Sequence, residues 1–157
     1  SSAGSFSKLA GQKEWEQLRD KYKNRIFALE HRTFSVSPIQ NAMDVAQLLP
    51  DGARLHLVSH SRGGLVGELL CLGQAGASKA RFDDLTKAFT GEKDAGVAAQ
   101  REEQRQQLKA LWELLDRKKI RVERFVRVAC PAHGTTLASK RMDVLASAMI
   151  KIGRAHV

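Results

Sequence analysis

One short segment of this 157-residue chain, Ser59-His60-Ser61-Arg62-Gly63, combines residue types and a spacing suited to acyl-transfer chemistry. An apolar, β-branched run precedes it and an apolar helical run follows it, so a sharp strand-to-helix turn is predicted here. Such a turn strains its central residue and admits only small residues two positions away on each side, a condition that Ser59 and Gly63 meet. The turn lifts the hydroxyl of Ser61 above the sheet edge, where it is predicted to act as a nucleophile.

The backbone next to Ser61 is predicted to stabilise the negative charge that develops during acyl transfer. The following helix begins with free N–H groups and a partial positive charge, and the Arg62 N–H is expected to stabilise the oxyanion of a tetrahedral intermediate. Two other interpretations remain open: a glycine-assisted turn with an incidental serine, and a phosphate-binding loop. The second is disfavoured because Leu65 follows Gly63-Gly64, where such a loop needs a Lys and then a Ser or Thr.

Three of the five histidines are candidates to line a site around Ser61. His60 is adjacent to the nucleophile, although neighbouring side chains at such a turn point apart. His31 ends a predicted strand at the same sheet edge, and His133 lies on a loop expected to face Ser61. As a general base, each has a weaker case than packing or local hydrogen bonding. His56 lies inside a predicted strand and is expected to be a core or sheet-face residue.

The sequence indicates neither a metal site nor a cofactor. No group of His, Cys, Asp and Glu has the spacing of metal ligands. Cys71 is interpreted as a small core residue on a helix, and Cys130 ends a strand with no activating partner visible. Two cysteines cannot form a disulfide framework, which favours a cytoplasmic setting. Three candidate acids are better explained as surface or cap residues: Glu30, Asp51 and Asp143.

Strands alternating with helices are predicted to position these residues, which is the pattern of parallel βαβ units and therefore of an α/β protein. Three strands are expected, at 25–29, 55–58 and 121–128, the first of them buried. Helices are expected over 13–23 and 65–72, after Ser37, and from about Ser139. Because three strands are too few for a complete sheet of this kind, an incomplete domain is expected over residues 1–151. Residues 152–157, with His156, are interpreted as a non-native tail.

Two local patterns predict further detail. The run Ser37-Pro38-Ile39-Gln40 predicts a helix start, with Ser37 accepting a backbone N–H and Gln40 completing a capping box. Residues 78–120 are predicted to be a helical insertion or lid. Its buried face is expected to carry an apolar stripe of Leu108, Leu111, Trp112 and Leu115.

Composition excludes several classes of protein. The chain has 26 Lys and Arg against 17 Asp and Glu, a formal net charge of +9, and 43 % apolar residues, which is ordinary for a globular protein. No apolar run approaches the ~20 residues that span a bilayer, and the first residues lack the pattern of a signal peptide. The basic stretch 117–121 permits peripheral contact with a membrane or a partner domain, although a solvated helix end leading into a strand is the better explanation. Alternating charges over 78–120 argue against binding of nucleic acid.

Three motifs, taken together, resemble the lipase-like α/β-hydrolases, over a region from Phe6 to about Leu145. They are EHRTFSVSPIQNA (30–42), LHLVSHSRGGLVGELL (55–70) and VRVACPAHGTTLAS (126–139). More narrowly, they are similar to the hydrolase domain that accompanies caspase-like CHAT modules in bacteria. The usual hydrolase motif has Gly where this chain has Ser59, a residue that is still small.

The resemblance implies a partial α/β-hydrolase fold and a serine esterase that acts on a small-molecule or lipid-like acyl ester. It also implies that a second oxyanion donor lies before Ser1 and that the family's Asp and His lie beyond Val157, so that this chain alone is expected to be inactive. The alternative is a non-catalytic interaction module of a multidomain bacterial protein, because a fold does not by itself imply a function. The sequence gives no indication of the oligomeric state.

Overall fold

A computed structural model of the chain describes residues 11–23, 25–29, 36–73, 82–83, 86–87 and 94–130. Several predictions concern residues outside these ranges. They are the positions of His31 and His133, the loop after Cys130, the helix from about Ser139 and the tail 152–157.

The described residues form an α/β arrangement around a two-stranded parallel sheet, which confirms the predicted class. Strand β1 (Arg54–His60) pairs with β2 (Arg121–Val128), with one irregularity of register after Leu55. Parallel strands need a long crossover connection. Here that connection includes α4 (Gly63–Leu70), the short 3-10 helix η2 (Cys71–Gly73) and α6 (Ala95–Arg117).

The prediction of a buried strand at 25–29 is wrong. These residues have no regular secondary structure, and the side chain of Phe27 is 83 % exposed. An apolar, β-branched run becomes a strand only when a neighbouring strand pairs with its backbone N–H and C=O groups. Within the described residues only β1 and β2 pair, so the expected count of three strands is not reached there.

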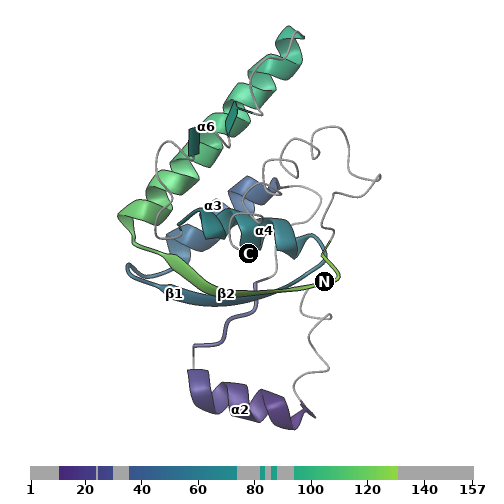
Figure 1. Cartoon of the computed structure of the whole chain (residues 1–157), viewed down its shortest axis with the longest axis vertical. Coiled ribbons are helices and arrows are strands. Elements are labelled where there is room, and N and C mark those ends of the chain that lie inside the picture. The colour runs from purple at the N-terminus through teal and green to yellow at the C-terminus, as the bar shows by residue number, and fades with distance from the viewer. Residues whose placement is uncertain are drawn as a thin grey trace.

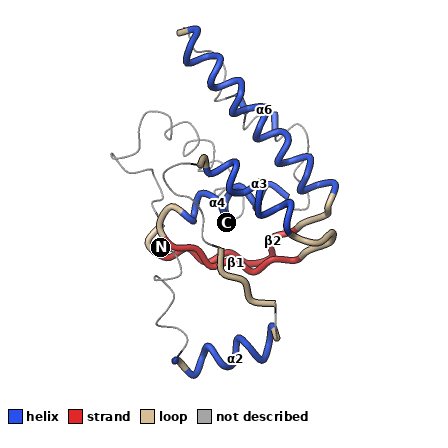
Figure 2. The backbone as a smooth tube through the Cα atoms, turned by 180° about the vertical axis from the view of Figure 1, so that it is seen from behind, coloured by secondary structure: helices blue, strands red, loops and turns tan. Residues whose placement is uncertain are grey.

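Three helices cover one face of the sheet. Figure 1 shows α3 (Pro38–Leu48), α4 and α6 on the same side of β1 and β2, and Figure 2 shows this layer from behind. The largest fully buried side chains lie on these helices and in the link from α6 to β2: Ile39, Leu69, Leu111, Leu115 and Ile120. Cys71 is also buried there, as predicted. Such apolar burial is the main favourable contribution to folding.

Helix α6 confirms the predicted apolar stripe for the described part of residues 78–120. Leu108, Leu111 and Leu115 are buried, and the half-buried Trp112 stacks on Phe82 with 5.2 Å between ring centroids. The helix leads into the amino end of β2 through Ile120, whereas Ser61 follows the carboxyl end of β1. Helix α6 is therefore part of the crossover between the strands. A lid over Ser61 stays a prediction.

At the start of α3, one of the two hydrogen bonds of the predicted capping box is present. Ser37 Oγ accepts a hydrogen bond from the Gln40 backbone N–H at 3.1 Å, with Pro38 in the first turn. The predicted return of the Gln40 side chain to Ser37 is wrong. Its amide instead donates to Asp44 Oδ1 at 2.7 Å, one turn further along the helix. A partner at i+4 lies directly beside it on the helix surface.

The other end of α3 is bound by a lysine that lies far away in the sequence. Lys118 Nζ donates to the carbonyl oxygens of Ala46 at 3.0 Å and Gln47 at 2.9 Å, and also to that of Leu49. These carbonyls lack partners within the helix and carry the negative end of its dipole. Part of the basic stretch 117–121 thus has a structural role.

Helix α2 (Lys13–Tyr22) forms where the sequence predicted a helix, but it lies on the other side of the sheet (Figures 1 and 2). None of its residues is buried. None of the described helices, α2 included, is both long enough and apolar enough to cross a lipid bilayer.

Candidate active site

The predicted strand-to-helix turn is present, and Ser61 occupies its strained position. Strand β1 ends at His60, α4 begins at Gly63, and Ser61 has a φ of +52°. Positive φ is uncommon for a residue with a side chain, because Cβ approaches the backbone too closely. Two hydrogen bonds hold this conformation: the Ser61 N–H donates to the Val128 carbonyl at 3.1 Å, and the Ser61 carbonyl accepts from the Gly64 N–H at 3.0 Å. The tertiary pairing of β1 with β2 therefore supports the strain at Ser61.

Two glycines bring α4 close to the end of the sheet. A Cβ atom added to Gly64 would lie 2.8 Å from both Cβ and Sγ of Cys130, and one added to Gly67 would lie 2.2 Å from Cζ of Phe125. Neither distance is compatible with ordinary van der Waals contact, which starts near ~3.5 Å. From the sequence, Ser59 and Gly63 were the small residues that the turn was expected to require, and neither Gly64 nor Gly67 was identified. The missed signal was a pair of glycines three residues apart, which share one face of a helix.

Cys130 lies beside the turn, a contact that the sequence did not predict. Its Sγ is 3.3 Å from Ser59 Oγ and 3.4 Å from the Val128 carbonyl oxygen, and its side chain is half-buried. Parallel pairing explains this contact, because the carboxyl ends of β1 and β2 meet at the same sheet edge. Cys130 and Ser59 therefore contact each other and lie against Gly64, next to the Ser61 turn.

The backbone of the turn leaves the Arg62 N–H as a donor for an external acceptor. The Arg62 carbonyl accepts from the Leu65 N–H at 3.0 Å, but within the described part of the chain no backbone carbonyl accepts from the Arg62 N–H. This donor precedes the first turn of α4, where the helix dipole favours negative charge. Its location next to Ser61 is the one expected for an oxyanion donor.

Neither histidine of β1 forms the base of a Ser–His pair with Ser61. The side chain of His60 is exposed, and its position in the strand places it on the face opposite Ser59. His56 precedes Ser61 by five residues, roughly 16 Å along an extended strand. Both of its ring nitrogens have other partners. His31 and His133, the other two predicted site-lining residues, lie outside the described ranges.

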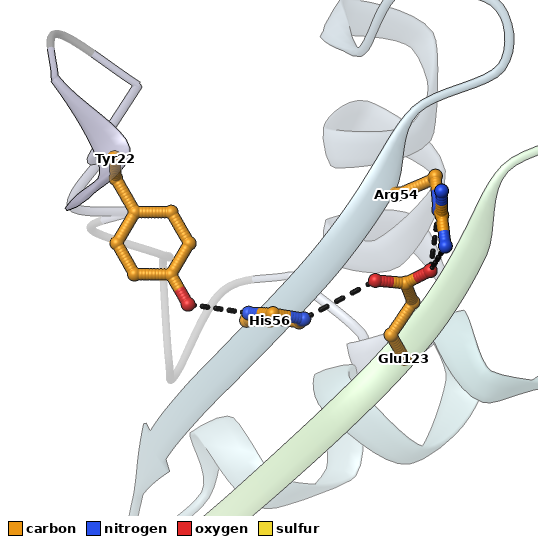
Figure 3. A network of polar contacts seen from close by, with 4 residues as sticks. All are labelled: Tyr22, Arg54, His56 and Glu123. Carbon is orange, nitrogen blue, oxygen red and sulfur yellow. Dashed lines mark hydrogen bonds and ion pairs between the residues drawn. The ribbon is translucent and has the colours of Figure 1, made fainter.

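His56 instead belongs to a polar network on the uncovered face of the sheet (Figure 3). Its Nε2 lies 3.2 Å from Glu123 Oε2, and its Nδ1 is hydrogen-bonded to the hydroxyl of Tyr22. Arg54 binds the same carboxylate and is the main reason why the pKa of Glu123 is lowered; His56 contributes less. A carboxylate only accepts, so Nε2 carries a hydrogen, and in the neutral ring Nδ1 accepts the Tyr22 O–H. The network ties α2 to both strands.

The described residues contain no group of three or more His, Cys, Asp and Glu side chains that could hold a metal ion. Among the described residues, the turn presents a hydroxyl group, a backbone donor and a nearby thiol.

Comparison with known families defines the class of protein. Residues 1–114 match the family described as domain of unknown function (DUF7379), and the chain belongs to this family. The matched region contains α2, α3, β1, the Ser61 turn, α4 and most of α6. Comparison with curated proteins and with solved structures gives no significant match.

Proposed function

We propose that this chain carries the nucleophile of a lipase-like α/β-hydrolase and that Ser61 attacks the carbonyl carbon of an acyl ester. The observation that carries the proposal is the φ of +52° at Ser61, between a strand of a parallel sheet and a helix. A strained serine at a strand-to-helix turn is the arrangement that exposes a nucleophilic hydroxyl in hydrolases of this type. Strain of this kind persists only where the surrounding structure maintains it.

In the proposed reaction, a general base takes the proton of Ser61 Oγ as the oxygen bonds to the acyl carbon. The carbonyl oxygen of the ester becomes an oxyanion, which the Arg62 N–H stabilises. The protonated base then gives its proton to the leaving alcohol as the C–O bond breaks, and an acyl-serine forms. Water, deprotonated by the same base, releases the acid and restores Ser61.

The general base is proposed to come from outside the described residues. Serine at its ordinary pKa is a weak nucleophile and needs such a partner. The resemblance to lipase-like hydrolases implies a histidine and an acid that follow the nucleophile in the chain. The substrate class is a small-molecule or lipid-like acyl ester, and no cofactor takes part.

Activity-based labelling tests this proposal on the full gene product that carries this sequence. A fluorophosphonate probe should label Ser61, and Ser61→Ala should abolish labelling and reduce hydrolysis of p-nitrophenyl butyrate by about 10³-fold or more. Ser59→Ala is the matched control, because it removes a serine hydroxyl two residues away. It should keep labelling and most of the turnover.

Two results would contradict the proposal. One is equal ester turnover with and without the Ser61 hydroxyl. The other is absence of labelling in a sample whose circular dichroism shows a cooperatively folded protein. Either result would favour the alternative of a non-catalytic interaction module built on the same fold.

A further inference from the structure

One face of the β1–β2 sheet carries apolar side chains that the described residues leave uncovered. Val58 is 60 % exposed, Val126 is 54 % exposed, and Val128 is also exposed. Val58 pairs with Val126, and His60 with Val128, so the three valines form one continuous patch, the valine patch. Parallel sheets occur almost only with both faces covered. The valine patch therefore lacks the cover that its architecture requires.

Helix α2 has an apolar stripe that also lacks a full partner. Trp15, Leu18 and Tyr22 follow one another at three and four residues, which places them on one face of the helix. Leu18 is 42 % exposed, and no residue of the helix is buried. Both views show α2 on the side of the sheet away from α3 and α4, which is the side of the valine patch (Figures 1 and 2).

The Tyr22–His56 contact sets a register between these two apolar surfaces. Tyr22 donates to His56 Nδ1, and the two rings meet edge to face with 5.6 Å between centroids. Val58 is the next residue after His56 on the same face of β1. Helix α2 runs opposite to β1 in Figure 1, so the helix residues that precede Tyr22 extend in the same direction as the strand residues that follow His56.

The spacings along the two elements agree. Residues two apart on a strand are separated by about 6.6 Å, and residues four apart on a helix by about 6 Å. With Tyr22 on His56, Leu18 therefore reaches Val58. Trp15, about 10.5 Å from Tyr22 along the helix axis, reaches the gap between Val126 and Val128. A helix that lies antiparallel to a neighbouring strand is also the usual packing in α/β proteins.

We propose that α2 is a strap that closes on the valine patch, with the Tyr22–His56 contact as its fixed end. In the closed state Leu18 packs on Val58, and Trp15 packs on Val126 and Val128. Glu123 and Arg54 maintain the fixed end, because the carboxylate holds the His56 ring in the tautomer that accepts the Tyr22 O–H. The inference does not depend on the proposed esterase activity.

Fluorescence of Trp15 tests the strap in the full chain. The second tryptophan is removed by Trp112→Phe, which keeps an aromatic ring against Phe82. Closure predicts blue-shifted emission from Trp15 and weak quenching by acrylamide. Val58→Lys should shift the emission to the red and raise the quenching constant, because a lysine in the valine patch opposes apolar contact.

Two further variants separate closure from general loosening of the protein. Val126→Lys should act like Val58→Lys, and it also serves if the latter fails to fold. Leu48→Lys is the matched control, since Leu48 is 83 % exposed on α3, in the helix layer on the other face of the sheet. This control should leave emission and quenching unchanged.

The strap is excluded if Trp15 in the parent is quenched as readily as free tryptophan amide, or if all three lysine variants give the same quenching constant. Dilution gives a further check. Quenching that rises on dilution would mean that Trp15 docks on a second copy of the chain, and this would also overturn the proposal.

Discussion

Replacing Gly67 by Ala tests whether the close approach of α4 to β2 is real. The added Cβ would lie 2.2, 2.6 and 3.0 Å from three ring atoms of Phe125, so the ring or the helix must move by more than 1 Å to restore contacts of about 3.5 Å. Overpacking of this kind costs about 1–3 kcal/mol. The higher helix propensity of Ala returns about 0.5–1 kcal/mol. The overpacking is the larger effect, and we expect a net loss of about 1–2 kcal/mol in the free energy of unfolding.

The assay is urea denaturation followed by far-ultraviolet circular dichroism, with Gly96→Ala as the matched control. Gly96 lies near the start of α6, and a Cβ there would meet only Asp94 Oδ1, at 3.4 Å. The same substitution at this open position should raise the denaturation midpoint, because only the propensity effect acts. Opposite signs at the two glycines are therefore expected. A stabilised Gly67→Ala would refute the packing argument.

A second substitution assigns the cost to the aromatic ring. In a Phe125→Leu background the atoms nearest to the added methyl group are removed, so Gly67→Ala should cost much less than in the parent chain. Residues in contact show such coupling, whereas distant residues behave additively. An unchanged cost in the Leu background would mean that Phe125 is not the obstacle.

Three further expectations concern single positions. Ser61→Gly should be more stable than Ser61→Ala by about 1 kcal/mol in chemical denaturation, because glycine adopts positive φ without strain; equal stability would argue against the strained turn. Lys118→Met should lower the free energy of unfolding by about 1–2 kcal/mol, since it leaves carbonyls at the end of α3 without their donor; an unchanged midpoint would contradict that role. The hydrogen bonds from Arg105 hold the pKa of Glu102 at about 2. Because a lowered folded-state pKa stabilises above the ordinary value of 4.5, this small contribution should be lost between pH 4.5 and pH 2. Carboxyl NMR titration measures that pKa directly, and it should rise toward the ordinary value in Arg105→Ala, where the weaker contribution of Gln106 remains.

Sequence reasoning succeeded where the decisive interactions are local. The cap of α3 depends on Ser37 and a backbone N–H three residues away, and the stripe of α6 depends only on helical periodicity. The Ser61 turn is also visible locally, as small residues between an apolar strand and an apolar helix. In the two helices, atoms within about one helical turn of each other determine the backbone conformation, whereas the strained φ of Ser61 is also supported by its bond to Val128.

Sequence reasoning failed where the partner is distant in the chain. Residues 25–29 have the composition of a strand, yet no described strand pairs with them. Cys130 has no visible partner in the sequence, because its contact with Ser59 arises only when the carboxyl ends of two parallel strands meet. His56 is likewise assigned by its contacts with Tyr22 and Glu123, 34 and 67 residues away.

The amino-acid sequence by itself therefore determined the α/β class, the start of α3, the apolar stripe of α6 and the serine at the turn. Tertiary structure alone decided that Gly64 and Gly67 bring α4 close to β2, that Lys118 binds the end of α3, and that Val58 and Val126 stay exposed on the other face of the sheet. The physical reason is that side-chain periodicity and capping act over a few residues, whereas strand pairing and close packing depend on which distant surfaces meet.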